Sequence, residues 1–181
     1  MSSPARIPVI LNTVLLGSVW GYALSVFGDL PARIPVHFGA SGAPDRWAET
    51  SLGSWLMLPI MGLFITGIMY AGSFVPLLGA KRPEIVSMPE KYRKRFLTLS
   101  QEERKAILDK VRALVCWTVV PSNALFAWIQ VETHAVATGQ RAAGRFAIAT
   151  AVFLVATVAI TAVGLVRIFR ALAGPAAAAG A

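Results

Sequence analysis

The sequence predicts an all-α integral membrane protein with four transmembrane helices. Its 181 residues are 56% hydrophobic and only 14% charged, whereas a soluble domain usually has about a quarter charged residues. The few charges are also grouped, because four long runs contain no Asp, Glu, Lys or Arg. These runs have 22, 31, 19 and 21 residues and cover 7–28, 50–80, 113–131 and 146–166. A helix needs about 20 apolar residues to cross a hydrocarbon core of about 30 Å, so each run can span a membrane once.

We expect a single membrane domain over residues 1–181. Its transmembrane helices are predicted at 7–28, 54–78, 112–132 and 146–167. The first run is too long for the apolar region of a secretory signal, and no A-x-A-type cleavage site follows it, so we expect an uncleaved span. The remaining segments are an outer loop at 29–53, a cytoplasmic segment at 79–111 and a low-complexity tail at 174–181.

The distribution of Lys and Arg predicts the orientation of these helices. Segment 79–112 contains ten such residues, whereas loops 29–53 and 133–145 contain two each. This difference places 79–112 and both termini in the cytoplasm, and loop 29–53 outside. We interpret the net charge of +8 as a topology signal that also attracts anionic lipid. We expect no nucleic-acid partner.

The cytoplasmic segment is predicted to form basic helices. Ser100 and Glu103 have the spacing of a capping box, which satisfies the free amides at a helix start, so a helix should begin there and continue into the third span. Ser87 and Glu90 have the same spacing before a short amphipathic helix. The basic residues of that helix are Lys91, Arg93, Lys94 and Arg95.

The short helix also has an apolar face. Met88, Tyr92 and Phe96 recur at intervals of four residues, which places them on one side of a helix. A basic amphipathic helix suits the inner membrane surface, and we favour that interpretation. The alternative is a docking site for a cytoplasmic protein partner over 87–112.

Residues 30–47, LPARIPVHFGASGAPDRW, interrupt the apolar runs with a stiff, polar loop. Its three prolines restrict φ and favour extended geometry in the residue before each, so two extended arms should flank a turn. Gly39 and Gly42 can adopt positive φ there. A rigid cap of this kind loses little entropy when it binds something. The residues predicted to contact a ligand or partner are Pro35, His37, Phe38, Asp45, Arg46 and Trp47.

The same stretch resembles the signature of a bacterial membrane domain of unknown function that also forms the N-terminal part of SdpI-type toxin-immunity proteins. The matching positions are Pro31, Ile34, Pro35, His37, Phe38, Gly42, Pro44, Asp45 and Trp47, and Pro89 and Lys91 match a second, cytoplasmic motif. The resemblance implies a multi-pass protein of the bacterial plasma (inner) membrane. In SdpI-type proteins the role is immunity to a secreted toxin and signalling that retains a transcription repressor. An immunity, sensing or partner-regulating function is therefore implied.

The third predicted span carries a polar stripe. Asn123, Gln130 and His134 lie on one helix face, because they are separated by seven and four residues. Amide and imidazole groups are costly against lipid tails, so this face should point into the bundle. We favour interhelical hydrogen bonding as its role. A small transporter is an alternative, although no charged residue lies in mid-membrane and no inverted repeat is visible.

We expect a non-enzymatic module with no catalytic residue and no cofactor, embedded in the lipid bilayer, whose outer loop recognises a peptide, a lipid or a protein partner. The alternative is a metal-dependent membrane enzyme. Its ligands would come from His37, Asp45, Glu132 and His134, because histidine and carboxylates suit zinc. Glu132 and His134 do not share a helix face, however, and no tight motif such as H-E-x-x-H is present.

Overall fold

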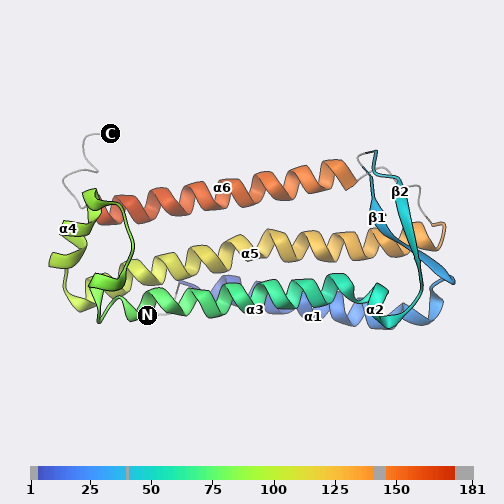
Figure 1. Ribbon diagram of the computed structural model, residues 1–181, viewed down its shortest axis with the longest axis horizontal. Helices are drawn as coiled ribbons and strands as arrows, with labels where there is room; N and C mark the ends of the chain where they lie inside the picture. Colours follow the sequence, from blue (N-terminus) through green and yellow to red (C-terminus); the bar gives the residue numbers. More distant parts are fainter. Residues whose placement is uncertain (1–3, 40, 141–145, 174–181) are drawn as a thin grey trace.

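Four long helices run side by side, each antiparallel to the next one along the chain (Figure 1). The computed structural model describes residues 4–39, 41–140 and 146–173. The helices are α1 (Arg6–Ser25), α3 (Met57–Leu78), α5 (Gln101–Ala137) and α6 (Phe146–Ala173). All four are long and apolar enough to cross a membrane, which confirms the predicted number of candidate spans. The predicted tail at 174–181 lies outside the described residues.

The expectation of an all-α fold is wrong between the first two long helices. This segment contains two antiparallel strands, β1 (Arg33–Phe38) and β2 (Pro44–Glu49). The prolines do produce two extended arms, as predicted, but the arms are long enough to pair through ladder hydrogen bonds. The fold is therefore mostly helical, with one β-hairpin at one end of the bundle (Figure 1).

Short elements flank the long helices, so these helices begin or end at residues that differ from the predicted bounds. After α1 ends at Ser25, the 3₁₀ turn η1 (Phe27–Asp29) leads to the hairpin. The one-turn helix α2 (Leu52–Trp55) begins at a capping box made by Ser51 and Ser54, so the second long helix begins at 57 rather than 54. Between α3 and α5 lie the 3₁₀ turn η2 (Pro83–Ile85) and the helix α4 (Glu90–Thr98).

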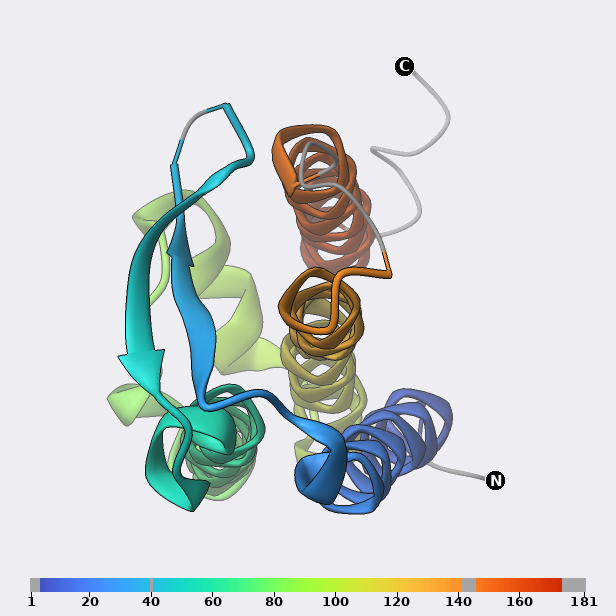
Figure 2. The ribbon, with the colours of Figure 1, turned by 90° about the vertical axis from the view of Figure 1, so that its right-hand side faces the viewer.

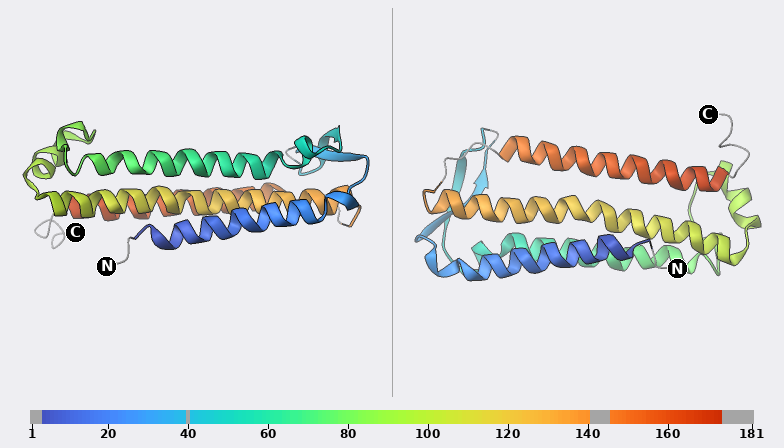
Figure 3. Two further views of the ribbon diagram at one scale, coloured as in Figure 1. Left: turned by 90° about the horizontal axis from the view of Figure 1, so that it is seen from below. Right: turned by 180° about the vertical axis from the view of Figure 1, so that it is seen from behind.

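Helix α5 is the centre of the bundle. It packs against α1, α3 and α6, and α1 also packs against α3, as the view along the helices shows (Figure 2). Its 37 residues extend about 55 Å at about 1.5 Å per residue, which exceeds a hydrocarbon core of about 30 Å. Its charged first turns therefore project beyond the core, at the end of the bundle where α1 begins and α6 ends (Figure 3).

The outer faces of the bundle are apolar. Ile148 and Val155 on α6 are 71% and 67% exposed, and Phe64 on α3 is 61% exposed. Continuous apolar surface of this kind is unfavourable in water, whereas lipid tails cover it and the helices satisfy their own backbone hydrogen bonds. The surface therefore fits a multi-pass membrane protein.

The two predicted capping boxes have different outcomes. At the start of α5, the Glu103 amide donates to Ser100 Oγ at 3.2 Å, and the Ser100 amide donates to Glu103 Oε2 at 2.8 Å. This confirms the first box and the unbroken helix that follows it. The box predicted at Ser87 is wrong, because α4 begins behind Pro89 without a side-chain cap.

The apolar face of α4 packs on protein and does not lie free for the membrane surface. The Tyr92 ring stacks on Phe169 of α6 at a centroid distance of 5.0 Å, and Phe96 is buried in a cluster with Ile168 and Leu172. Helix α6 extends beyond its predicted end at 167, which supplies this surface. The preferred interpretation of a lipid-facing helix is therefore wrong for the apolar side. The basic residues remain exposed at Lys91, Arg93, Lys94 and Arg95.

Candidate functional site

The tip of the hairpin is a tight turn built on glycine. Gly42 has φ 79°, a left-handed conformation that glycine adopts without strain. The Gly39 amide donates to the Ala43 carbonyl and the Gly42 amide to the Gly39 carbonyl, both at 2.9 Å. This confirms the prediction for Gly42. Gly39 does not have positive φ, but a Cβ atom there would lie 3.1 Å from Asp45 Oδ2, so a larger residue would require the Asp45 side chain to shift.

A polar link joins the two strands next to this turn. His37 Nδ1 on β1 lies 2.5 Å from Asp45 Oδ1 on β2, and the side chains remain 58% and 52% exposed. The strand register is irregular on both sides of His37, which lies opposite Arg46. The sequence predicted both residues as contacts for a ligand but did not predict that they pair. The pair fixes the imidazole while leaving it accessible.

The base of the hairpin is anchored to the bundle by one tryptophan. Trp55 of α2 is 2% exposed and packs in a cluster with Ile34 of β1 and Ala23 of α1. Its Nε1 donates to the Ala23 carbonyl at 2.7 Å. A buried indole usually finds such a partner for its N–H group. The hairpin is therefore attached to the helices through its first strand.

Two residues of the polar stripe on α5 form hydrogen bonds next to the same cluster. Gln130 Nε2 donates to the Trp55 carbonyl at 3.2 Å, and His134 Nδ1 lies 2.9 Å from the Tyr22 hydroxyl of α1. The stripe therefore faces the bundle interior, as predicted. Tyr22 and Trp55 were not among the residues predicted from the sequence. The available signal was an aromatic residue with a polar atom near the end of an apolar run, a position these residues favour.

A cavity of about 810 Å³ lies beneath the hairpin, between β1 and helices α3, α5 and α6. Its walls are mainly apolar, as in most small-ligand sites of this volume. Three of the predicted contact residues, Pro35, His37 and Phe38, line it together with Gln130 of the stripe. The hairpin extends over the space between α3 and α6, which flank α5 (Figure 2).

The other predicted contact residues lie outside this cavity. Asp45, Arg46 and Trp47 are on β2, and Asp45 contacts the lining residue His37. The Trp47 side chain is 41% exposed. The structure therefore separates a cavity-lining strand from an outer strand, a division that the sequence did not predict.

Deeper in the bundle, three helices meet at a buried polar cluster. Asn123 Nδ2 of α5 donates to Asn12 Oδ1 of α1 at 2.8 Å and to Thr66 Oγ1 of α3 at 2.9 Å. Asn12 Nδ2 donates in turn to the carbonyls of Pro8 and Cys116, at 2.9 and 3.0 Å. This agrees with the predicted structural role of the stripe. Asn12 was not predicted from the sequence, although a single asparagine inside an apolar run is a signal for such a contact.

The four residues of the metal-enzyme alternative do not assemble into a site. His37 and Asp45 pair on the hairpin, whereas His134 contacts Tyr22 inside the bundle and Glu132 is buried on the same helix. In residues 4–39, 41–140 and 146–173, no group of three or more His, Cys, Asp and Glu side chains is placed to hold a metal ion. The geometry therefore gives this alternative no set of ligands.

Comparison with known proteins identifies the hairpin region. Residues 14–63 match the family model of DUF1648, a domain of unknown function, and this range contains both strands and α2. An uncharacterised protein of Archaeoglobus fulgidus is 41% identical over 39 residues, which are 22% of this chain and 21% of that protein. The match therefore covers about a fifth of this relative. No solved structure matches the chain.

Proposed function

We propose that this chain is a non-enzymatic receptor of the bacterial plasma membrane that binds a peptide in the cavity under the hairpin and thereby serves immunity or sensing. The observation that carries this proposal is the cavity itself, which combines an apolar interior with the His37–Asp45 pair at its edge. Such a site fits a ligand with both apolar and polar groups. The anchored hairpin is already ordered, so binding loses little conformational entropy.

A peptide suits this cavity better than a lipid because of the strand that covers it. In the described part of the chain, β1 pairs only with β2, so no strand lies along its other edge. An extended peptide can bind such an edge through its main chain while its apolar side chains enter pockets. A lipid tail has no groups that could use this edge.

The proposed orientation places the hairpin outside the cell and both termini in the cytoplasm. The ten Lys and Arg residues of segment 79–112 lie at the opposite end of the bundle from the hairpin (Figure 1), which is the arrangement that the positive-inside rule favours. The cavity is then open to a secreted peptide. The resemblance to SdpI-type proteins supports a toxic peptide as the ligand.

The orientation predicts a labelling pattern in intact cells. In a Cys116→Ala background, a Ser41→Cys variant should react with a membrane-impermeant maleimide without permeabilisation, because position 41 is exposed at the hairpin tip. A Glu102→Cys variant should react only after permeabilisation, because position 102 is exposed at the other end. The reverse pattern would show that the hairpin is cytoplasmic.

Site-specific photo-crosslinking in cells tests the receptor function. A photoreactive amino acid at Phe38 faces the cavity, and the same group at Trp47 on β2 is the control on the outer strand. We expect a discrete peptide adduct, identified by mass spectrometry, from position 38 and at least about tenfold less from position 47.

Two results would contradict the receptor function. One is an adduct at position 38 that contains only lipid, or equal yields of the same peptide from both positions. The other is an unchanged cellular phenotype after residues 30–47 are replaced by a flexible linker of equal length, in a variant whose insertion is verified by maleimide labelling at position 102.

A further inference from the structure

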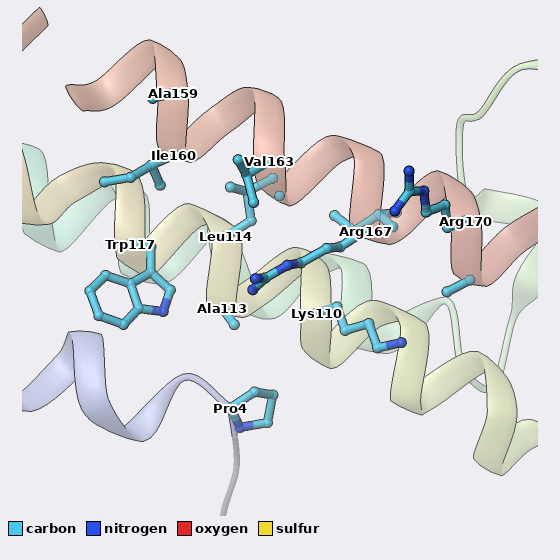
Figure 4. A pocket seen from close by; sticks show the side chains of 13 residues that line it. Pro4, Lys110, Ala113, Leu114, Trp117, Ala159, Ile160, Val163, Arg167 and Arg170 are labelled. Atoms are coloured by element: carbon cyan, nitrogen blue, oxygen red, sulfur yellow. The ribbon is translucent and has the colours of Figure 1, made fainter. Parts of the chain in front are cut away.

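A second cavity, of about 790 Å³, lies at the end of the bundle opposite the hairpin, between α5, α6 and Pro4, which precedes α1 (Figure 4). Its inner part is apolar and includes Ala113, Leu114, Trp117, Ile160 and Val163. Its outer part carries three cations, Lys110, Arg167 and Arg170, and none of the described residues that line it is acidic. The cavity thus has a positively charged mouth and an apolar interior.

Within the described ranges, none of Lys110, Arg167 and Arg170 makes an ion pair or a side-chain hydrogen bond. The Arg167 side chain reaches from α6 toward α5, the helix that carries Lys110 (Figure 4). Three unpaired cations around one cavity are available to bind an anion.

The cavity crosses the expected boundary between headgroups and lipid tails. Arg167 is the first charged residue after the apolar run at 146–166, and Lys110 lies just before the run at 113–131. Ala159, at the inner end of the cavity, precedes Arg167 by eight residues, or about 12 Å along a helix. The cations are therefore at headgroup depth, and the apolar part is at the depth of the upper acyl chains.

We propose that this cavity is a specific site for one anionic phospholipid. Its phosphate lies among Lys110, Arg167 and Arg170, and an acyl chain occupies the apolar part beside Trp117. Basic pockets between transmembrane helices are suited to such headgroups. A free phosphate would leave the apolar part unused, and a zwitterionic lipid would bring no net charge to the cations. The site is separate from the hairpin cavity, so a negative result for lipid binding would not contradict the proposed receptor function.

Native mass spectrometry of the full-length, delipidated protein measures this binding directly. The protein is titrated with palmitoyl-oleoyl phosphatidylglycerol, with the phosphatidylcholine that has the same chains, and with glycerol 3-phosphate as the headgroup without tails. We expect phosphatidylglycerol to bind with a stoichiometry of one and about tenfold or more tighter than phosphatidylcholine. Glycerol 3-phosphate should bind only weakly. Equal affinity for both lipids, or tight binding of glycerol 3-phosphate, would overturn the proposal.

A matched pair of variants locates the site. The first variant removes the three cations of the cavity, by Lys110→Gln, Arg167→Gln and Arg170→Gln. Its affinity for phosphatidylglycerol should be about tenfold lower or more. The control variant removes the same charge from the exposed face of α4, by Lys91→Gln, Arg93→Gln and Lys94→Gln. Its affinity for phosphatidylglycerol should change less than about twofold. An equal loss in both variants would show attraction to total charge alone, and so would overturn a specific site.

A photoreactive acyl chain provides a readout that does not depend on folding of the variants. Phosphatidylglycerol with a diazirine in its acyl chain should label the wild-type protein in nanodiscs at Trp117 or its cavity neighbours on α6. Excess unlabelled phosphatidylglycerol should remove this labelling, whereas excess phosphatidylcholine should not. Labelling spread evenly over the exposed faces of α3 and α6 would contradict a specific site.

Discussion

Replacing Trp55 with alanine is expected to lower the free energy of unfolding by about 3–5 kcal/mol and to release the hairpin from the bundle. Trp55 is almost completely buried between Ile34 and Ala23, so its removal leaves a large cavity in the cluster that joins β1 to α1. The hydrogen bond from its Nε1 to the Ala23 carbonyl is lost as well. Unfolding in a denaturing detergent, followed by circular dichroism, measures the change in free energy.

Hydrogen exchange distinguishes release of the hairpin from general destabilisation. In the Trp55→Ala variant, the amides of β1 and β2 should exchange faster, while those in the middle of α5 should keep most of their protection. Trp47→Ala is the matched control, because Trp47 is on the same hairpin but 41% exposed, and it should change stability by less than about 0.5 kcal/mol. If the two variants behave alike, Trp55 is not the anchor of the hairpin.

The membrane-spanning part of the fold was predictable from the sequence because it follows from composition. Charged side chains are excluded from the hydrocarbon core at a cost of several kcal/mol, so their absence over about 20 residues identifies a span without reference to other parts of the chain. The start of α5 was predictable for a similar reason, since the capping box of Ser100 and Glu103 is a contact between residues three apart. Both signals are local.

The features that the sequence did not predict depend on contacts between distant segments. Proline and glycine indicated extended arms and a turn, but the pairing of His37 with Asp45 required the actual register, which is irregular at His37. The apolar face of α4 was predicted for the membrane surface because an amphipathic pattern does not distinguish lipid from protein. Phe169, which is 77 residues after Tyr92 in the sequence, packs on this face in the structure.

One part of the candidate site could be predicted from the sequence, and another part could not. Pro35, His37 and Phe38 were predicted from the composition of one loop, and the structure brings them to the cavity with Gln130 of α5. Nothing in the loop indicates that α3, α5 and α6 form the rest of the wall. The division between a cavity strand and an outer strand therefore had to come from the structure.

Replacing Asn123 with leucine is expected to destabilise the bundle by about 1–3 kcal/mol without preventing insertion of the four helices. Asn123 joins Asn12 of α1 and Thr66 of α3, and both partners would be left with unmet hydrogen bonds in an apolar setting. Leucine and asparagine have side chains of the same length, but the two terminal methyl groups of leucine cannot form hydrogen bonds. Insertion should persist, because leucine increases the hydrophobicity of the span.

A double-mutant cycle separates the hydrogen bonds of this cluster from the effect of size. If Asn123 and Thr66 are coupled, the combined Asn123→Leu and Thr66→Val variant should be less destabilised than the sum of the single variants by about 0.6–1.7 kcal/mol. Thr157→Val is the control, because the Thr157 hydroxyl donates within its own helix to the Phe153 carbonyl at 2.9 Å and joins no second helix. Thr66→Val should therefore lower the melting temperature more than Thr157→Val. Equal shifts, with additive energies in the cycle, would mean that the polar cluster does not hold the three helices together.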